Sequence, residues 1–285
     1  MVAASLASTI SAFTTQLQER TSRAYDAYLA EARQAFLSRI RTTGATVAGR
    51  EGVLTARPGR EDGIIDVPGG LVHHWVGAAF IRGVTARKVV DVSCDYAGYS
   101  GIYKAIIASR LIEREGDTFR VLMRLKEGEA GVTAVLDVHS TVQYFYPSSQ
   151  SAYALSNADQ IREVRNAGES GERLLPAGQD SGFLWRANTF SRFTEQEGGV
   201  FVEMETLGLS RRFPIMLGWL IEPIARRLGR RSVETSLHEF IAAVRTAASL
   251  SDDRPTWNAK AQPSLAGDSA SFGLASAKAG SLSTV

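Results

Sequence analysis

Two adjacent histidines are the side chains of this sequence best suited to acid–base or metal chemistry. They lie in the apolar run GGLVHHWVGAAFIRG, residues 69–83. The run predicts a strand, in which neighbouring side chains point to opposite faces, so His73 and His74 cannot easily bind one metal ion. One of them shares a face with Trp75 and is a weak candidate for a pocket acid or base. A hydrogen-bonded structural role is the favoured interpretation of both.

Other signatures of catalysis and metal binding are missing from the sequence. Cys94 is the single cysteine, which excludes an internal disulfide and a cysteine-rich zinc site. The motifs H-x-H, H-E-x-x-H and G-x-S-x-G do not occur, nor does a P-loop or a dinucleotide-binding glycine motif after a strand. We therefore expect no metal and no cofactor, and a non-enzymatic protein is favoured.

The composition is that of an ordinary globular protein. Of 285 residues, 44% are hydrophobic and 22% are charged. A net charge of +2 is too small to indicate a nucleic-acid partner. No apolar run approaches the roughly 20 residues that a membrane-spanning helix needs.

The elements that must position any site begin with a long helix over residues 13–42. Apolar residues recur in it at spacings of three and four, which places them on one stripe: Leu17, Tyr25, Tyr28, Leu29, Ala32, Phe36 and Ile40. The sequence leaves open whether this helix packs on the outside of a sheet or mediates self-association. A glycine-rich segment follows it and is interpreted as a linker.

Seven strands are predicted from short alternating runs. They cover residues 70–82, 105–114, 118–127, 132–146, 151–165, 182–196 and 199–209. Most gaps between them are of hairpin length, which favours an antiparallel sheet. Two short helices are expected between the first two strands. One face of each strand is mostly apolar and the other mostly polar, so we expect the polar face to meet water.

A last helix is predicted over residues 214–247, interrupted where Pro223 follows Glu222. It carries two apolar stripes separated by the basic segment RRLGRRS. Basic residues of this kind are able to meet acidic lipid headgroups, although a solvated helix face is the favoured interpretation. Peripheral membrane contact through Trp219 to Arg231 is therefore kept as an alternative.

Four segments carry a resemblance to a known family: VPGGLVHHWVGAAFIRGVT, CDYAGYSGIYKAIIASRLIEREGDTFRVLMRL, SGFLWRANTFSRF and LGWLIEPIARRLGRRSVETSL. They resemble an uncharacterised bacterial START-like group of the START-like and polyketide-cyclase (SRPBCC) superfamily, over about residues 66–247. The resemblance implies an α+β helix-grip fold, in which a curved antiparallel sheet of about seven strands wraps a long C-terminal helix. It also implies a cavity between them, which relatives use for lipids, sterols or polyketides and a minority use for cyclisation or aromatisation.

The leading hypothesis is therefore a binding or carrier protein for a hydrophobic small molecule such as a lipid, fatty acid, sterol or polyketide. The residues expected to line its cavity are Trp75, Tyr96, Tyr99, Tyr103, Arg110, Leu136, Tyr144, Trp185, Phe193, Met204, Trp219 and Leu220. The aromatic members fill a closed core equally well. One alternative is a cyclase-like or hydrolytic enzyme that uses a pocket histidine and a tyrosine as acid and base. The other is a membrane-docked lipid exchanger.

The chain is divided by prediction into four parts. Residues 1–12 are a flexible N-terminus or a degenerate export signal, 13–65 the helix and linker, 66–248 the helix-grip domain, and 249–285 a disordered tail rich in Ala, Ser and Gly. The compartment stays open, being cytoplasmic, or periplasmic or secreted if the N-terminus is an export signal. The oligomeric state is not predicted.

Overall fold

The computed structural model of the chain describes residues 17–41, 51–60, 62–129, 132–176, 178–212 and 215–250. The predicted flexible N-terminus and nearly all of the predicted C-terminal tail lie outside these ranges. Among the described residues, no helix is both long and apolar enough to cross a membrane.

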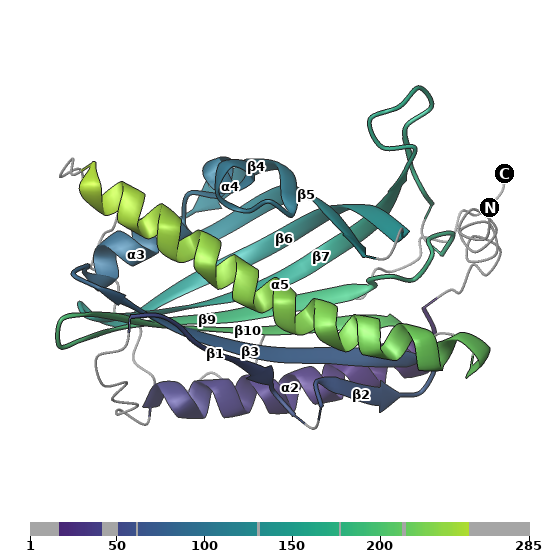
Figure 1. The fold of residues 1–285 in the computed structure, drawn as a ribbon, viewed down its shortest axis with the longest axis horizontal. Helices are drawn as coiled ribbons and strands as arrows, with labels where there is room; N and C mark the ends of the chain where they lie inside the picture. Colours follow the sequence, from purple (N-terminus) through teal and green to yellow (C-terminus); the bar gives the residue numbers. More distant parts are fainter. Residues whose placement is uncertain are drawn as a thin grey trace, which may run out of the picture.

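One antiparallel sheet with the strand order β1-β3-β10-β9-β7-β6-β5-β4 forms the centre of the molecule (Figure 1). Short strands β2 and β8 pair with β3 and β7. The bounds are β1 Gly52–Pro58, β2 Ile64–Val67, β3 Gly70–Arg82, β4 Ile106–Glu115, β5 Thr118–Glu129, β6 Val132–Ser148, β7 Ser151–Arg165, β8 Arg173–Leu174, β9 Arg186–Gln196 and β10 Gly199–Arg211. The helices are α2 Glu19–Arg41, α3 Ala86–Ser93, the 3-10 turn η1 Tyr96–Gly98, α4 Tyr99–Ile102 and α5 Ile215–Ser249.

The seven predicted strands are confirmed, but the segment interpreted as linker up to residue 65 is partly sheet. Strands β1 and β2 both pair with β3, end to end, and Gly59 and Gly63, at their adjoining ends, both hydrogen-bond to the backbone of His74. Gly63 has φ +89°, a conformation that favours glycine. Strands this short show no clear alternation in the sequence, so glycine dominated the prediction.

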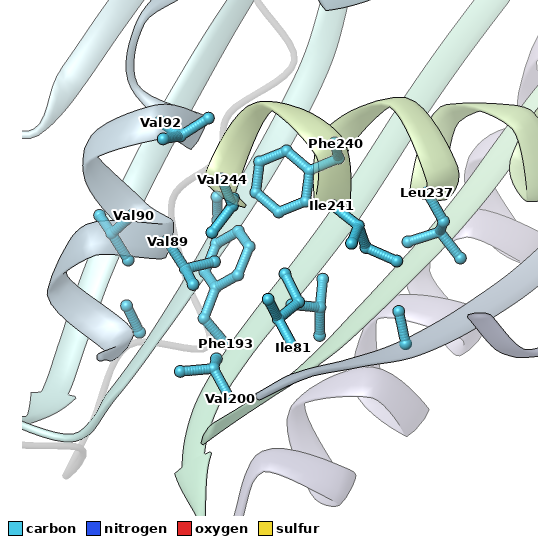
Figure 2. Packing of buried hydrophobic residues seen from close by; sticks show 14 of the residues in the cluster. Ile81, Val89, Val90, Val92, Phe193, Val200, Leu237, Phe240, Ile241 and Val244 are labelled. Atoms are coloured by element: carbon cyan, nitrogen blue, oxygen red, sulfur yellow. The ribbon is translucent and has the colours of Figure 1, made fainter. Parts of the chain in front are cut away.

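Helix α5 packs across β1 and β3 on one face of the sheet, which we call the inner face. Its second half buries the predicted stripe Val233, Leu237, Phe240, Ile241 and Val244 against the sheet and α3 (Figure 2). A Cβ placed on Gly77 of β3 would lie 2.3 Å from Val233 Cγ1, so the missing side chain lets the helix approach closely. The predicted interruption at Pro223 is not seen, because the turns on both sides of it remain helical.

Helix α2 covers the opposite, outer face of the sheet. Its predicted apolar stripe is confirmed, since Tyr25, Tyr28, Ala32 and Phe36 form a buried cluster with residues of β3, β7, β9 and β10. We call this the α2 cluster. The expectation that the polar strand face meets water is therefore wrong over the area that α2 covers. Polar side chains on a strand form hydrogen bonds and ion pairs either with water or with polar side chains of a helix packed on them.

Phe36 offers a direct test of how strongly α2 is held. Its ring is fully buried and lies 5.3 Å from the ring of Phe190, between centroids. We expect Phe36→Ala to lower the free energy of unfolding by about 3–5 kcal/mol, because it leaves a cavity between helix and sheet. Urea denaturation measures this change.

Gln34→Ala is the matched control, since Gln34 is exposed on the same helix and should change stability by less than about 0.5 kcal/mol. Equal, small effects of both substitutions would show that α2 is an appendage rather than a layer of the fold.

Candidate functional site

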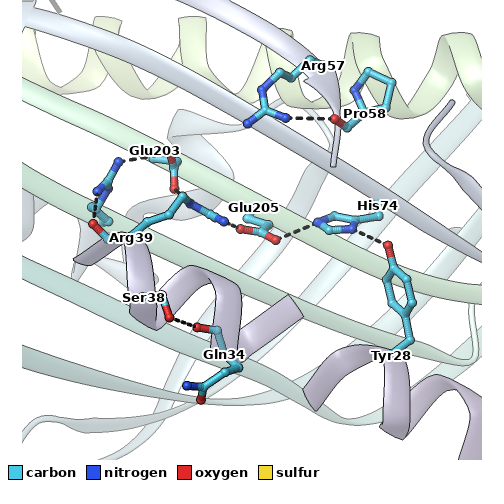
Figure 3. A network of polar contacts seen from close by, with 10 residues as sticks. Tyr28, Gln34, Ser38, Arg39, Arg57, Pro58, His74, Glu203 and Glu205 are labelled. Atoms are coloured by element: carbon cyan, nitrogen blue, oxygen red, sulfur yellow. Dashed lines mark hydrogen bonds and ion pairs between the residues drawn. The ribbon is translucent and has the colours of Figure 1, made fainter. Parts of the chain in front are cut away.

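The two adjacent histidines lie on opposite faces of the sheet, as the strand prediction requires. His74 points outward beneath α2 and is buried (Figure 3). Its Nδ1 lies 2.7 Å from the Tyr28 hydroxyl and its Nε2 lies 2.7 Å from Glu205 Oε1. A neutral imidazole satisfies both partners, with Nε2–H donating to the carboxylate and Nδ1 accepting from the hydroxyl. Nδ1 therefore joins β3 to α2, while Nε2 joins β3 to Glu205 of β10.

Charged side chains extend this network along the outer face. Arg39 of α2 forms ion pairs with Glu205 and with Glu203, the latter at 3.2 Å, and Arg192 of β9 also reaches Glu203 at 3.2 Å. The sequence is interpreted above as placing the polar face of each strand in water. That interpretation is wrong for Glu203 and Glu205, which are buried. Burial raises the pKa of Glu205, but the hydrogen bond from His74 and the charge of Arg39 outweigh it and hold the pKa below its ordinary value.

His73 points to the inner face and has a different partner. Its Nε2 lies 2.8 Å from the Ser210 hydroxyl of β10. Burial lowers the pKa of His73 to about 4, so the imidazole is neutral near pH 7. The histidine expected to face the interior beneath the last helix is therefore His73, held by a serine rather than by a tyrosine.

Tyrosines fill one end of the inner face. The hydroxyls of Tyr96 and Tyr144 lie 2.9 Å apart, and both Tyr144 and Tyr99 donate to the Ser93 carbonyl oxygen, at 2.8 and 2.7 Å. Burial raises the pKa of all three, so they stay protonated at neutral pH. Because α3 and the sheet already engage these hydroxyls, the tyrosines act first as core.

A band of hydroxyl side chains crosses the inner face next to this core. It consists of Ser156 of β7, Thr189 and Ser191 of β9, and Thr206 of β10, and we call it the hydroxyl band. The register places Ser156 opposite Thr189, and Thr189 opposite Thr206. All four are partly exposed, and none of their hydroxyls forms a hydrogen bond within the described part of the chain.

Apolar clusters border the hydroxyl band on both sides along the strands. On β7, Ala152 and Ala154 belong to the large cluster beneath α5, which we call the α5 cluster, and Ser156 follows them. The next inward residue, Ala158, is buried with Leu136 and Val138 in a separate group, which we call the Leu136 cluster. The band is thus a polar strip between two apolar clusters on the inner face of the sheet.

Trp75 continues the row of the band onto β3. It lies directly opposite Thr206 in the register. The indole packs between two backbones, because a Cβ on Gly229 of α5 would lie 2.3 Å from its Nε1 and one on Gly63 would lie 2.7 Å from its ring. Its Nε1–H is buried and has no hydrogen-bond partner in the described structure. An unpaired buried donor of this kind costs about 1–3 kcal/mol.

The structure brings together many, but not all, of the residues predicted to line a cavity. Trp75, Tyr96, Tyr103, Tyr144 and Phe193 meet in the α5 cluster, with Tyr99 and Met204 packed against it. Leu136 lies on the same face in its own cluster.

Other predicted lining residues lie elsewhere. Trp185 packs beside the α2 cluster and donates from Nε1 to Asp180 at 3.1 Å, so it does not join Tyr144. Arg110 is exposed on β4, opposite Leu122 and away from the inner face, so it does not supply a polar group there. The side chains of Trp219 and Leu220 lie outside the described part of the structure.

Sequence reasoning missed the hydroxyl band because it searched for large or ionisable side chains. A signal was present: Thr189 and Ser191 occupy the same parity as Phe193, where the apolar pattern of β9 expects hydrophobic residues. On three neighbouring strands, small hydroxyl residues occupy positions where the pattern predicts hydrophobic side chains. Analysis of one strand at a time does not show that these positions are adjacent.

Comparison with known proteins finds similarity at the level of structure. No family model and no curated protein matches the chain. A protein of Thermus thermophilus is 15% identical, with a TM-score of 0.46 over 61% of this chain and 99% of that one. The Zhui aromatase/cyclase from Streptomyces sp. R1128 is 15% identical, with a TM-score of 0.41 over 62% and 94%. Human STARD10 is 9% identical, with a TM-score of 0.42 over 68% and 77%.

The order of elements in the structure is itself that of the helix-grip fold. A strand, two short helical segments, a run of antiparallel strands and a long final helix follow each other, and the curved sheet holds α5 on its inner face. The chain therefore has the α+β helix-grip fold that the resemblance implied, with α2 on the outer face of the sheet.

The buried network beneath α2 predicts a pH-dependent stability. We expect Glu205→Gln to lower the free energy of unfolding at pH 7 by about 3–5 kcal/mol, because Arg39 loses a buried counter-charge. Since the folded pKa of Glu205 lies below 4.5, its contribution is present above that pH and is lost as the pH falls through the folded value. Urea denaturation at pH 7 and pH 3 should show the difference between variant and wild type shrinking in acid.

Glu113→Gln is the control, because its ion pair with Arg120 is exposed and is worth less than about 1 kcal/mol. A loss for Glu205→Gln as small as that of the control would contradict a structural role for the network.

Proposed function

We propose that the protein binds or carries an apolar small molecule between the inner face of the sheet and α5. The observation that carries this proposal is the hydroxyl band. Four partly exposed residues, whose hydroxyls have no protein partner in the described part of the chain, lie in a strip bordered by buried apolar clusters on the inner face of the sheet.

Desolvation explains why such a band favours a ligand. A hydroxyl at a covered interface costs free energy unless it finds a hydrogen-bond partner. Ligand sites are mostly apolar, with a few polar groups that orient the bound molecule. The α5 cluster and the Leu136 cluster supply apolar walls, and the hydroxyl band supplies the polar groups.

The positions of the histidines give little support to the alternative of a cyclase-like or hydrolytic enzyme. His74 does pair with a tyrosine, Tyr28, but the pair lies beneath α2 on the outer face and also holds Glu205. His73 faces inward with Ser210, and burial lowers its pKa to about 4, which makes it a weak base.

The membrane-docked alternative depends on the first half of α5. Of its basic residues, Arg230 and Arg231 are exposed, and Arg230 pairs with Glu234 at 3.2 Å. An exposed pair of this kind suits a solvated helix face as well as it suits a lipid headgroup.

Filling the band should block binding without unfolding the protein. Thr189→Phe places a large side chain in the centre of the band, between Ser156 and Thr206. We expect it to lower the affinity for an uncharged apolar probe such as N-phenyl-1-naphthylamine, or for a bound host lipid, by about 10-fold or more, about 1.4 kcal/mol. Fluorescence titration and native mass spectrometry of protein purified from its host measure this loss.

Thr194→Phe is the matched control, since Thr194 lies on the same strand, is also half-buried, and points to the outer face. It should leave binding unchanged at a similar cost in stability. Equal binding by wild type and both variants, or no ligand in any of them, would overturn the proposed site.

A further inference from the structure

We infer that the exposed edge of β4 is an interface at which two copies of this chain form a two-fold symmetric dimer. The surface consists of Ile107, Arg110, Leu111, Ile112 and Glu113, and we call it the β4 patch. Apolar side chains meet at the two-fold axis, and ion pairs between the copies flank them. The interface lies at the edge of the sheet and does not depend on the proposed ligand site.

The strand β4 ends the sheet, so no other strand pairs with its free edge among the described residues (Figure 1). At the other end of the sheet, β1 packs against α5. The helical segments η1 and α4 pack near the first half of β4, where the Ser100 N–H donates to Ser109 Oγ at 3.0 Å. From Arg110 to Glu115 every residue of β4 is exposed. This half of the strand is therefore accessible to a partner.

Apolar side chains gather on this edge. The described part of the chain has five exposed large hydrophobic residues, and three of them lie within six positions of β4: Ile107 at 48%, Leu111 at 36% and Ile112 at 45% exposure. Ile107 and Ile112 are also the extra residues of two β-bulges, since the register with β5 shifts at each. Bulges turn side chains and interrupt pairing, and protected edges commonly carry charges at such positions. The isoleucines therefore favour contact through side chains over extension of the sheet.

The second bulge brings two opposite charges onto one face of the sheet. Arg110 is opposite Leu122, and Glu113 is opposite Arg120. Positions 120 and 122 are two apart on β5, which pairs with β6 without a shift in register, so they point to the same side. Arg110 and Glu113 therefore share that face, although they are three positions apart in the sequence.

These charges complement each other across a two-fold axis. When two β4 strands lie antiparallel with the axis between Leu111 and Ile112, Arg110 of each copy faces Glu113 of the other. Leu111 of each copy then faces Ile112 of the other. Glu113 already pairs with Arg120 of its own chain at 3.1 Å, and the second copy adds a second guanidinium. A contact of this kind uses the same patch on both copies and closes at the dimer.

The size of the β4 patch sets the strength of the dimer. The strand has 10 residues, which span about 33 Å. A stable interface buries about 800 Å² of each partner, which is more than the side chains of one strand edge supply. Exposed ion pairs fix the alignment more than they add affinity. We therefore expect a weak dimer, with a dissociation constant on the order of 10–100 μM.

Sedimentation equilibrium of the full-length protein measures this association. We expect monomers at about 1 μM and mostly dimers at about 500 μM. Ile112→Ser removes the apolar contact at the axis and should raise the dissociation constant by about 10-fold or more. Leu174→Ser is the matched control, because Leu174 is exposed to a similar extent, 39%, on β8, and it should leave the dissociation constant unchanged.

Charge reversal tests the alignment of the two copies. Arg110→Glu makes both charges of the patch acidic and Glu113→Arg makes both basic, so each variant alone should dimerise at least about 10-fold more weakly. An equimolar mixture of the two variants restores opposite charges on both sides of the axis and should form a heterodimer with nearly wild-type affinity. Arg57→Glu, exposed on β1 at the other edge, is the control and should not weaken the dimer. Circular dichroism verifies that each variant is folded.

Several outcomes would overturn the inference. They are a protein that stays monomeric over the whole concentration range, and one that assembles beyond the dimer. A dimer that neither Ile112→Ser nor the single charge reversals weaken uses another surface. A mixture of the two charge-reversed variants that stays monomeric shows that these charges do not face each other. Thr189→Phe acts on the inner face and should leave the dimer unchanged, so this inference and the proposed function fail separately.

Discussion

The close packing of α5 on β3 is the contact on which the rest of the inner face depends. Gly77 leaves room for Val233 and Leu237, and Gly229 lies against the indole of Trp75. These glycines bring the helix down onto the β1–β3 side of the sheet. The strands β7, β9 and β10 carry small hydroxyls where larger side chains would otherwise fill the interior. The helix therefore packs closely over β1 and β3, whereas the small hydroxyl residues leave space over β7, β9 and β10, where we propose that the ligand binds.

The outer face of the sheet differs from the inner face because charged side chains are buried there. It carries buried charges, which are costly unless they are paired. Arg39 of α2 pairs with Glu203 and Glu205, and His74 joins Glu205 to Tyr28, so the helix adds partners to those that Arg192 and His74 already supply from the strands. The two adjacent histidines thus have separate roles because a strand sends neighbouring side chains to opposite faces: His74 belongs to the attachment of α2, and His73 to the interior beneath α5.

Periodicity predicted most of the architecture. The stripe that contains Tyr25 and Phe36 and the stripe that contains Leu237 and Val244 were both assigned correctly, because a helix repeats its buried face every three to four residues. The strands β1 and β2 were missed because seven and four residues between glycines show too few alternations. Trp185 was placed beneath the last helix on parity alone, but it stands just before β9 begins, where the alternation no longer holds.

The sequence by itself determined which side chains share a face in most of the predicted strands, and its resemblance to a known family indicated a helix-grip fold. It also determined that His73 and His74 point to opposite faces of the sheet. Only the tertiary structure decided that α2 covers the polar face, and that Trp75, Thr206, Thr189 and Ser156 stand in one row. These four residues lie up to 131 positions apart in the chain (206 − 75). What aligns them is the hydrogen-bond register between strands, which arises from pairing across the whole sheet and leaves no local pattern.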